Sequence, residues 1–396
     1  MADPVVLIVD DNDDNRFTLS MRLEACGYEN IVTAENGREA LEKMRQGPVD
    51  LVLLDIMMPE MNGYQVLEHL KADTELRDLP VIVITALDEM DSVIKCIEFG
   101  AEDYLAKPFN PTLLRARVGA SLEKKRLRDE VRAGRDRLQQ ELDAARTLQL
   151  GMLPGTFPAW SAEHPVEVHA LMEPAREVGG DLYDCFWASA HLFCFLVGDV
   201  SGKGAPAAMF MARARSLVRL AVEYSRNDCA ENISPSPIAE AVNRELCQNN
   251  PERMFVTLFL GLLDTRTGAL AYINAGHPAP GLLRANNDIE RLDGKPEPPL
   301  GVRPNTAYQC RAVTLRPTDA VVVHTDGVTE AMNIGEELYT AERLNADLAA
   351  LRNETPEAIV RTVKDRVDAF TGTAPRADDV TLLACAGARR RHDQWS

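Results

Sequence analysis

Two sets of aspartates in this sequence have the side-chain chemistry and the placement that divalent metal ions require. The first set follows short apolar runs near the N-terminus and consists of Asp10, Asp11 and Asp55. The second set lies beyond residue 180 and consists of Asp181, Asp199, Asp326, Asp378 and Asp379. Magnesium and similar hard cations prefer oxygen ligands, whereas carboxylates gathered without a cation repel one another. We therefore expect two all-oxygen metal sites.

The segment GDVSGKG at residues 198–204 looks at first like a nucleotide-binding phosphate loop. A Walker-type loop has four residues between its glycines and a serine or threonine after the lysine. Here three residues separate Gly198 from Gly202, and Gly204 follows Lys203. The nucleotide interpretation is excluded, and Asp199, at the end of an apolar run, is left as a metal ligand.

A second phosphate-binding pattern is also present by spacing alone. Cys247 and Arg253 bracket five residues, as in the nucleophile loop of cysteine-dependent phosphatases. The intervening QNNPE contains no glycine, and Pro251 removes a backbone donor where such a loop must offer N–H groups to phosphate. We attribute this spacing to chance.

The first 110 residues must position the first aspartate set. Short β-branched runs such as VVLIVDD and PVIVITA alternate with amphipathic stretches, which predicts an α/β domain with a parallel sheet covered on both faces. Asp10, Asp11 and Asp55 end their strands, so they converge at the carboxyl edge of the sheet. Thr85 and Lys107, at two other strand ends, point a hydroxyl and an ammonium at the same crevice.

These residues resemble the CheY-like receiver domain of bacterial response regulators, over residues 1–122. The resemblance implies a flavodoxin-like fold with five parallel strands. It implies that Asp55 accepts a phosphoryl group from a histidine kinase or phosphotransfer protein. The remaining implied roles are magnesium binding by Asp10, Asp11, Asp55 and the Met57 carbonyl, phosphoryl binding by Thr85 and Lys107, a switch role for Tyr104, and a cis peptide before Pro108.

The residues from Pro111 to about Leu153 predict one long polar helix, and its part at 123–153 links two domains. Its apolar residues recur at spacings of four, seven, four and three, and they are Leu127, Val131, Leu138, Leu142 and Ala145. A narrow apolar seam on a charged helix needs a partner to bury it. Two alternatives stay open, which are a homodimeric coiled coil and packing against a flanking domain.

Residues 154–388 must position the second aspartate set. Strand-like runs follow one another through turns, and helical segments are expected near 205–224, 235–249 and 341–369. This order predicts an α+β sandwich of two antiparallel sheets flanked by helices. We expect residues 389–396 to form a tail.

This part of the chain resembles the PPM-type serine/threonine phosphatases, specifically their SpoIIE/RsbU branch. The resemblance rests on EVGGDLYD, GDVSGKG, NAGHPAP, TDGVTEA and ADDVT, and on ARTLQLGMLP, which is similar to the helical switch that precedes the catalytic domain in that branch. It implies two manganese or magnesium ions. The implied ligands are Asp181 and Asp199 as bridges, the Val200 carbonyl, Asp326 and Asp378.

Three further residues have two possible roles each. Asp379 stands next to the last implied ligand and could be a ligand itself. Arg176 could bind the substrate phosphate or form a surface salt bridge. His277, in NAGHP, could support a turn or act as an acid.

Composition narrows the function. The formal net charge of -18 argues against nucleic acid as a partner, and no apolar stretch approaches the roughly 20 residues of a membrane-spanning helix. We expect a cytoplasmic response regulator that dephosphorylates a phosphoserine or phosphothreonine protein under the control of Asp55. The resemblance implies a STAS-domain anti-anti-sigma factor as substrate. The alternative is an adaptor that binds a sigma factor for regulated proteolysis, as in RssB.

Overall fold

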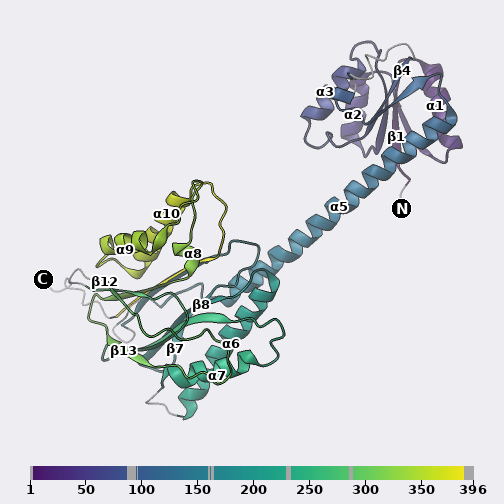
Figure 1. The fold of residues 1–396 in the computed structure, drawn as a ribbon. Helices are drawn as coiled ribbons and strands as arrows, with labels where there is room; N and C mark the ends of the chain where they lie inside the picture. Colours follow the sequence, from purple (N-terminus) through teal and green to yellow (C-terminus); the bar gives the residue numbers. More distant parts are fainter. Residues whose placement is uncertain are drawn as a thin grey trace. The chain divides into compact units, whose positions relative to one another are not determined.

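The computed structural model describes residues 3–86, 95, 97–158, 161, 165–228, 233–284 and 289–387. The expected tail at 389–396 and half of the residues 91–100 lie outside these residues. The chain divides into two compact units, Met1–Gln139 and Gln140–Ser396, and each is described by itself (Figure 1).

The first unit is built on one parallel sheet. Its strands are β1 (Val5–Val9), β2 (Asn30–Ala34), β3 (Leu51–Asp55), β4 (Val81–Ala86) and β5 (Asp103–Lys107). They lie in the order β2-β1-β3-β4-β5, and every neighbouring pair is parallel. This is the predicted flavodoxin-like arrangement, and it brings the carboxyl ends of β1, β3, β4 and β5 to one edge.

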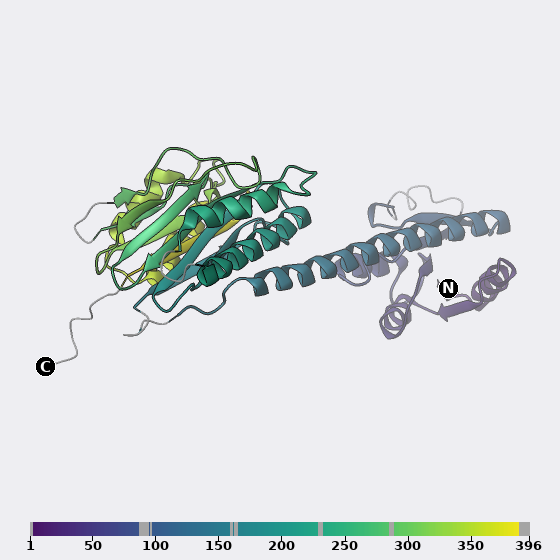
Figure 2. The same ribbon diagram turned by 90° about the horizontal axis from the view of Figure 1, so that it is seen from below.

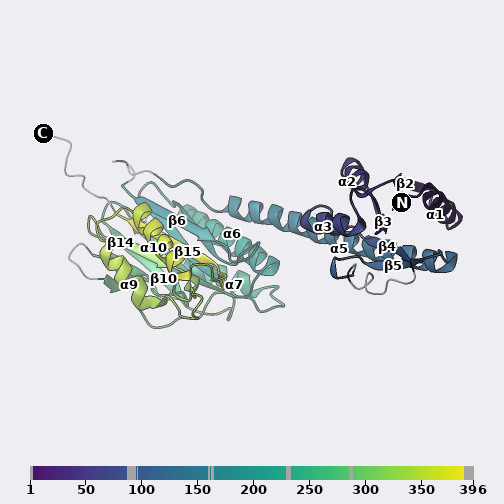
Figure 3. The same ribbon diagram turned by 90° about the horizontal axis from the view of Figure 1, so that it is seen from above.

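Helices cover both faces of this sheet (Figure 3). They are α1 (Asp13–Ala25), α2 (Gly37–Gln46), α3 (Gly63–Ala72) and the beginning of α5 (Pro111–Met152). Alternate residues of the strands pack against α2 and α3 on one side and against α1 and α5 on the other. Asn12, Asn36 and Asn62 cap α1, α2 and α3 by accepting backbone hydrogen bonds in the first turn.

The helix α5 is continuous over 42 residues, as the sequence predicts, and Gly134 lies inside it without interrupting it. Its first part is tied to the first unit by ion pairs. Lys124 and Arg128 both pair with Glu102, and Arg132 pairs with Asp78 at 2.8 Å. These ion pairs hold the first part of α5 against the first unit.

The second unit is a sandwich of two antiparallel sheets, as predicted. One sheet has the order β13-β10-β9-β8-β7 and the other β12-β11-β14-β15-β6. The strands are β6 (Glu167–Glu173), β7 (Leu182–Trp187), β8 (Leu192–Val200), β9 (Val256–Asp264), β10 (Ala269–Ala275), β11 (Gly281–Leu283), β12 (Ile289–Arg291), β13 (Arg311–Thr314), β14 (Ala320–His324) and β15 (Val380–Ala386). The core between the sheets contains Phe195, Leu260, Val321 and Leu383.

Helices form the outer layers of the sandwich (Figure 2). They are α6 (Ala205–Asp228) and α7 (Pro235–Cys247) on the first sheet, α9 (Thr340–Ala350) and α10 (Pro356–Thr371) on the second, and the short α8 (Asp326–Thr329). The single helical segment expected at 341–369 is therefore two helices. Asn353 has a φ of 65°, and Thr355 caps a new helix that has Pro356 at its first position.

Candidate metal centres

The first aspartate set does converge at the carboxyl edge of the parallel sheet. Asp10 and Asp11 follow β1, and Asp55 ends β3. One carboxylate oxygen from each of the three lies within 4.8 Å of the others. Asp10 is fully buried and Asp55 is 7 % exposed, whereas Asp11 is exposed. Two buried acids thus share a crevice with one that faces solvent.

Lys107 connects the two buried acids. Its Nζ lies 2.9 Å from Oδ2 of Asp10 and 2.8 Å from Oδ2 of Asp55. Burial raises the pKa of Asp55, and the Lys107 ammonium opposes this effect while Asp10 adds to it. Burial alone would lower the pKa of Lys107, but hydrogen bonds to Asp55 and Asp10 outweigh it, so that the pKa is raised. Lys107 therefore stays charged beside Asp55.

Sequence reasoning missed two residues that hold Asp10. Asn15 donates from Nδ2 to both oxygens of the Asp10 carboxylate, at 3.0 and 3.1 Å. The buried Arg16 donates to the Asp10 backbone carbonyl at 2.6 Å. Both lie on α1, five and six residues after Asp10. The sequence could have indicated this role, because Arg16 is a charged residue on the side of α1 that packs against the sheet.

The remaining receiver residues lie around this crevice. Thr85 is buried near the end of β4, and the Lys107–Pro108 peptide is cis, as expected. Tyr104 lies on β5 with the Arg117 guanidinium 4.9 Å from its ring centre. Met57 follows β3, and its side chain is exposed, so only its carbonyl is suited to the role implied for it.

The second aspartate set gathers where strands and turns of both antiparallel sheets meet. Asp181 precedes β7, Asp199 lies in β8, Asp326 begins α8, and Asp378 and Asp379 precede β15. Burial raises the pKa of Asp199 to about 7, and Asp326 and Asp378 contribute to the rise. Burial, then Asp199 and Asp379, raise the pKa of Asp181 well above its ordinary value. These aspartates therefore lie near enough for their charges to interact.

Asp181 is the most enclosed member of the set, at 1 % exposed. Its Oδ2 accepts hydrogen bonds from the hydroxyls of Thr325 at 2.8 Å and Thr381 at 2.6 Å. The Thr325 hydroxyl in turn accepts from the Thr381 backbone N–H at 3.0 Å. Two threonines that sequence reasoning did not single out therefore fix the orientation of this carboxylate.

The carboxylate of Asp379 is directed at backbone N–H groups. Its Oδ1 accepts from Ala175 at 2.8 Å, and its Oδ2 accepts from Gly180 at 2.7 Å and Asp181 at 3.4 Å. A Cβ atom at Gly179 would lie 2.3 Å from Oδ2 of Asp379, so only glycine fits there. The carboxylate of Asp379 thus accepts three backbone hydrogen bonds.

The GDVSGKG loop follows β8 through two glycines in the left-handed region. Gly202 has a φ of 90° and Gly204 a φ of 75°, conformations that side chains disfavour. The Val200 carbonyl faces Gly180, where a Cβ atom would lie 2.8 Å from it. Lys203 extends to Asp378, with its Nζ 2.9 Å from Oδ2. The loop thus places a carbonyl and a cation beside the aspartates.

The end of α5 contacts the loop that carries Asp181. The Gln149 Nε2 donates to the Gly179 carbonyl at 2.6 Å, and its Oε1 accepts from the Gly179 N–H at 3.1 Å. Gln149 is 4 % exposed. Gln149 belongs to the ARTLQLGMLP segment, and through it this segment contacts the loop that carries Asp181.

Three other candidates are placed as follows. His277 is buried, and its Nδ1 lies 2.9 Å from the Thr257 hydroxyl. Burial and His324 lower the pKa of His277 to about 3, which disfavours a role as an acid. Arg176 lies exposed between β6 and β7. Burial raises the pKa of Cys247, contrary to what a thiolate nucleophile requires.

Both aspartate sets suit hard cations. Their side chains offer oxygen ligands, and burial together with neighbouring carboxylates raises the pKa values of Asp181 and Asp199. A divalent cation relieves this repulsion. The residues present therefore fit the metal ions that the sequence predicts.

Comparison with known families covers both units. The family described as stage II sporulation protein E (SpoIIE) matches residues 189–386, which is half of the chain. The response regulator receiver domain matches residues 6–119. No helix among the described residues has the length and apolar character to cross a membrane.

The similar curated proteins each match part of this chain. Protein IcfG of Synechocystis sp. is 31% identical over 278 residues, which are 64% of this chain and 42% of that protein. Probable transcriptional regulator ycf27 of Guillardia theta is 44% identical over 119 residues, which are 30% of this chain and 45% of that protein. The chain thus spans less than half the length of these curated relatives.

A solved structure supports the fold of the second unit. The SiaA-PP2C domain of Pseudomonas aeruginosa superimposes with a TM-score of 0.54 at 20% identity, covering 64% of this chain and 98% of that domain. At this identity the likeness concerns the fold alone. The chain belongs to the SpoIIE family and also contains a response regulator receiver domain.

Proposed function

We propose that this chain is a metal-dependent protein phosphatase whose substrate is a phosphoserine or phosphothreonine protein. The observation that supports it most is the convergence of Asp181, Asp199 and Asp326, whose pKa values are all raised by burial and by neighbouring carboxylates. Such an arrangement is costly unless cations bind, and a two-metal site is suited to hydrolysis of phosphate esters.

Each residue has a part in this proposal. Two manganese or magnesium ions would be held by Asp181 and Asp199, together with Asp326, Asp378 and the Val200 carbonyl. Bound metal ions would supply an activated water and neutralise charge on the phosphate. Thr325 and Thr381 both donate hydrogen bonds to Oδ2 of Asp181 and so fix the orientation of its carboxylate.

The receiver domain is the proposed control element. Asp55 would accept a phosphoryl group from a histidine kinase or phosphotransfer protein, with magnesium bound by Asp10, Asp11, Asp55 and the Met57 carbonyl. Lys107, which already lies 2.8 Å from the Asp55 carboxylate, would neutralise the added charge. Thr85 would bind a phosphoryl oxygen, and Tyr104 would respond on the neighbouring strand.

We further propose that two copies of the chain associate through α5. Leu127, Val131 and Leu138 are 50%, 73% and 57% exposed. Their spacing of four and seven places all three at core (a or d) positions of the same heptad register. Glu123 precedes Arg128 by five residues, and Glu130 precedes Arg135 by five residues. In a parallel coiled coil this spacing pairs opposite charges across the two helices.

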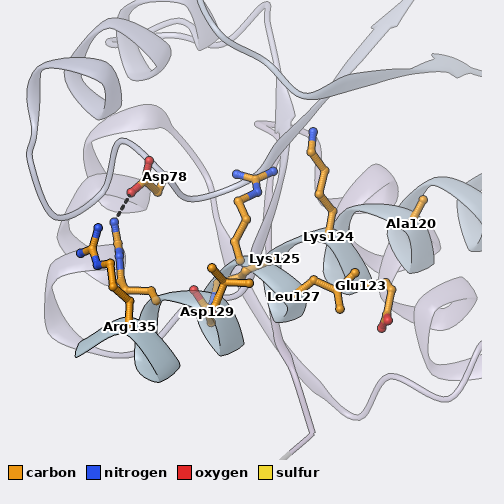
Figure 4. A pocket seen from close by; sticks show the side chains of 11 residues that line it. Asp78, Ala120, Glu123, Lys124, Lys125, Leu127, Asp129 and Arg135 are labelled. Atoms are coloured by element: carbon orange, nitrogen blue, oxygen red, sulfur yellow. Dashed lines mark hydrogen bonds and ion pairs between the residues drawn. The ribbon is translucent and has the colours of Figure 1, made fainter. Parts of the chain in front are cut away.

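A groove beside this seam is consistent with the proposed partner (Figure 4). It has a volume of about 730 Å³ and is lined by Leu127 and Val131 together with charged side chains of both signs, among them Lys124 and Asp129. Its mixed charge is suited to a second copy of the same helix, which carries the same charges.

The proposed substrate is a STAS-domain anti-anti-sigma protein phosphorylated on serine. The rival function is an adaptor that delivers a sigma factor to a protease by binding alone. The aspartate set favours the enzyme, because binding alone does not require five converging carboxylates.

Phosphate release separates the two functions. The wild-type chain and Asp199→Ala are incubated with manganese and a serine-phosphorylated STAS-domain protein. We expect release by the wild type and at least a hundredfold loss in the variant. Equal rates would exclude the proposed catalysis. Beryllofluoride should change the rate in the wild type and leave it unchanged in Asp55→Asn.

A further inference from the structure

We propose that Asp379 is a positioning residue that holds together the three segments carrying Asp181, Asp326 and Asp378, and that it is not a metal ligand. The inference rests on the proposed function, because it assigns a role within the same site. In this proposal the carboxylate of Asp379 binds backbone N–H groups and does not bind a metal ion.

The side chain of Asp379 closes the loop that precedes β7. Its two oxygens accept from the N–H groups of Ala175 and Gly180, at 2.8 and 2.7 Å. These residues lie five apart, so one carboxylate fixes both ends of the loop. Arg176, the candidate for binding substrate phosphate, lies on the loop between them. Asp181 directly follows it and also donates its N–H to Asp379.

The backbone of Asp379 contacts the segment that carries Asp326 and also the side chain of its neighbour Asp378. Its carbonyl accepts from the Thr325 hydroxyl at 3.4 Å, and a Cβ atom at Gly327 would lie 2.0 Å from that carbonyl. Its N–H donates to Oδ1 of Asp378 at 2.9 Å. The turn that carries Asp326 and the carboxylate of Asp378 are therefore both placed against the same residue.

The directions of the oxygens argue against metal binding by Asp379. It is 8 % exposed, and the structure shows three backbone N–H groups bonded to its two oxygens. A carboxylate that coordinated a metal would have to give up some of these bonds and leave buried N–H groups unpaired, which is unfavourable. Asp378 is free of this constraint, because its side chain is 44% exposed and its Oδ2 pairs with Lys203.

The test compares Asp379→Asn with Asp199→Asn, a change in a proposed ligand, in the full-length chain. Asparagine is close in shape to aspartate, but its NH₂ group cannot accept a hydrogen bond, so one end of the loop is released. Without metal, we expect Asp379→Asn to lower the thermal midpoint and to speed hydrogen exchange at Ala175 and Gly180. We expect Asp199→Asn to leave the midpoint unchanged or raise it, because a repelling charge is removed.

Manganese titration by calorimetry gives the second readout. Asp379→Asn should still bind two ions per phosphatase domain with roughly tenfold weaker affinity, whereas Asp199→Asn should lose stoichiometric binding. The KM for phosphoprotein should also rise in Asp379→Asn, because Arg176 is no longer held. Loss of one ion in Asp379→Asn, with unchanged exchange at Ala175 and Gly180, would show that Asp379 is a ligand and overturn the proposal.

A second variant covers the case in which Asp379→Asn does not fold. Gly179→Ala displaces the Asp379 carboxylate by a steric clash and leaves every charge in place. It should reproduce the faster exchange and the weaker manganese affinity, and an unchanged affinity would contradict the proposal. If the wild type binds no manganese, the proposed function fails, and the metal-free comparison of stability and exchange still decides the role of Asp379.

Discussion

The Lys203 ammonium lies 2.9 Å from Oδ2 of Asp378 and so places a fixed positive charge at the edge of the second aspartate set. Lys203 also lowers the pKa of Asp326, an effect smaller than the rise that burial and Asp378 cause there. The lysine therefore neutralises part of the negative charge that a metal ion would otherwise meet.

Replacing Lys203 should strengthen metal binding. In Lys203→Gln the aspartates lose their nearby cation, and we expect the half-saturating manganese concentration to fall several-fold. Calorimetric titration measures it, with Lys364→Gln on α10 as a control that also removes one positive charge. Added salt should reduce the difference, since part of the pair is exposed. Weaker manganese binding in Lys203→Gln would contradict this prediction.

The metal-free phosphatase domain should lose stability as the pH rises. The pKa of Asp199 is about 7 in the folded chain, above its ordinary value of 3.8, so the folded state binds more protons than the unfolded state between these values. Stability is then present below about pH 4 and is lost as the pH rises through about 7. Each pKa unit corresponds to about 1.4 kcal/mol.

Thermal melts from pH 5 to pH 8, with a chelator present, test this dependence. We expect the midpoint of the phosphatase domain to fall by several degrees, and manganese to reverse the fall at pH 8. Asp199→Asn should flatten the profile. A midpoint that rises with pH in the metal-free wild type would exclude the raised pKa.

Gln149 should couple α5 to the Asp181 loop. In Gln149→Ala the N–H and carbonyl of Gly179 both lose their partner, at a cost of about 1–3 kcal/mol. We expect a lower thermal midpoint for the phosphatase domain and slower phosphate release. Thr147→Ala, an exposed change two residues earlier, is the matched control. Equal release by both variants would show that the contact does not support the site.

The proposed dimer can be tested by exchanging charges on α5. Arg135→Glu places like charges opposite Glu130 on both sides of a parallel coiled coil, and exposed pairs contribute about 0.2–1 kcal/mol each. We expect roughly tenfold weaker association in sedimentation equilibrium. The double variant Glu130→Arg with Arg135→Glu restores opposite charges and should restore the wild-type constant. If all three chains associate equally, α5 does not pair in this way.

The aspartates were predictable because each stands beside an apolar strand-like run, before it or at its end, where strand geometry places side chains at a sheet edge. The residues that orient these aspartates could not be predicted from the sequence. Thr381 bonds to Asp181 across 200 positions of sequence, and only the folded sandwich brings the two together. Asp379 shows a different limit, because sequence identifies a carboxylate but not the direction of its oxygens. The division between α9 and α10 depends on Asn353 and Thr355, two polar residues inside an otherwise helical pattern.

The unbroken course of α5 makes the length of the linker as significant as its sequence. An α-helix advances about 100° per residue, so inserting two residues after Gly134 would turn Gln149 by about 200° with respect to Arg117. An insertion of seven residues would change that angle by only about 20°. Receivers exchanged between proteins of this kind are therefore expected to keep control of the phosphatase when the junction preserves whole heptads, and to lose it when the junction shifts the helical phase.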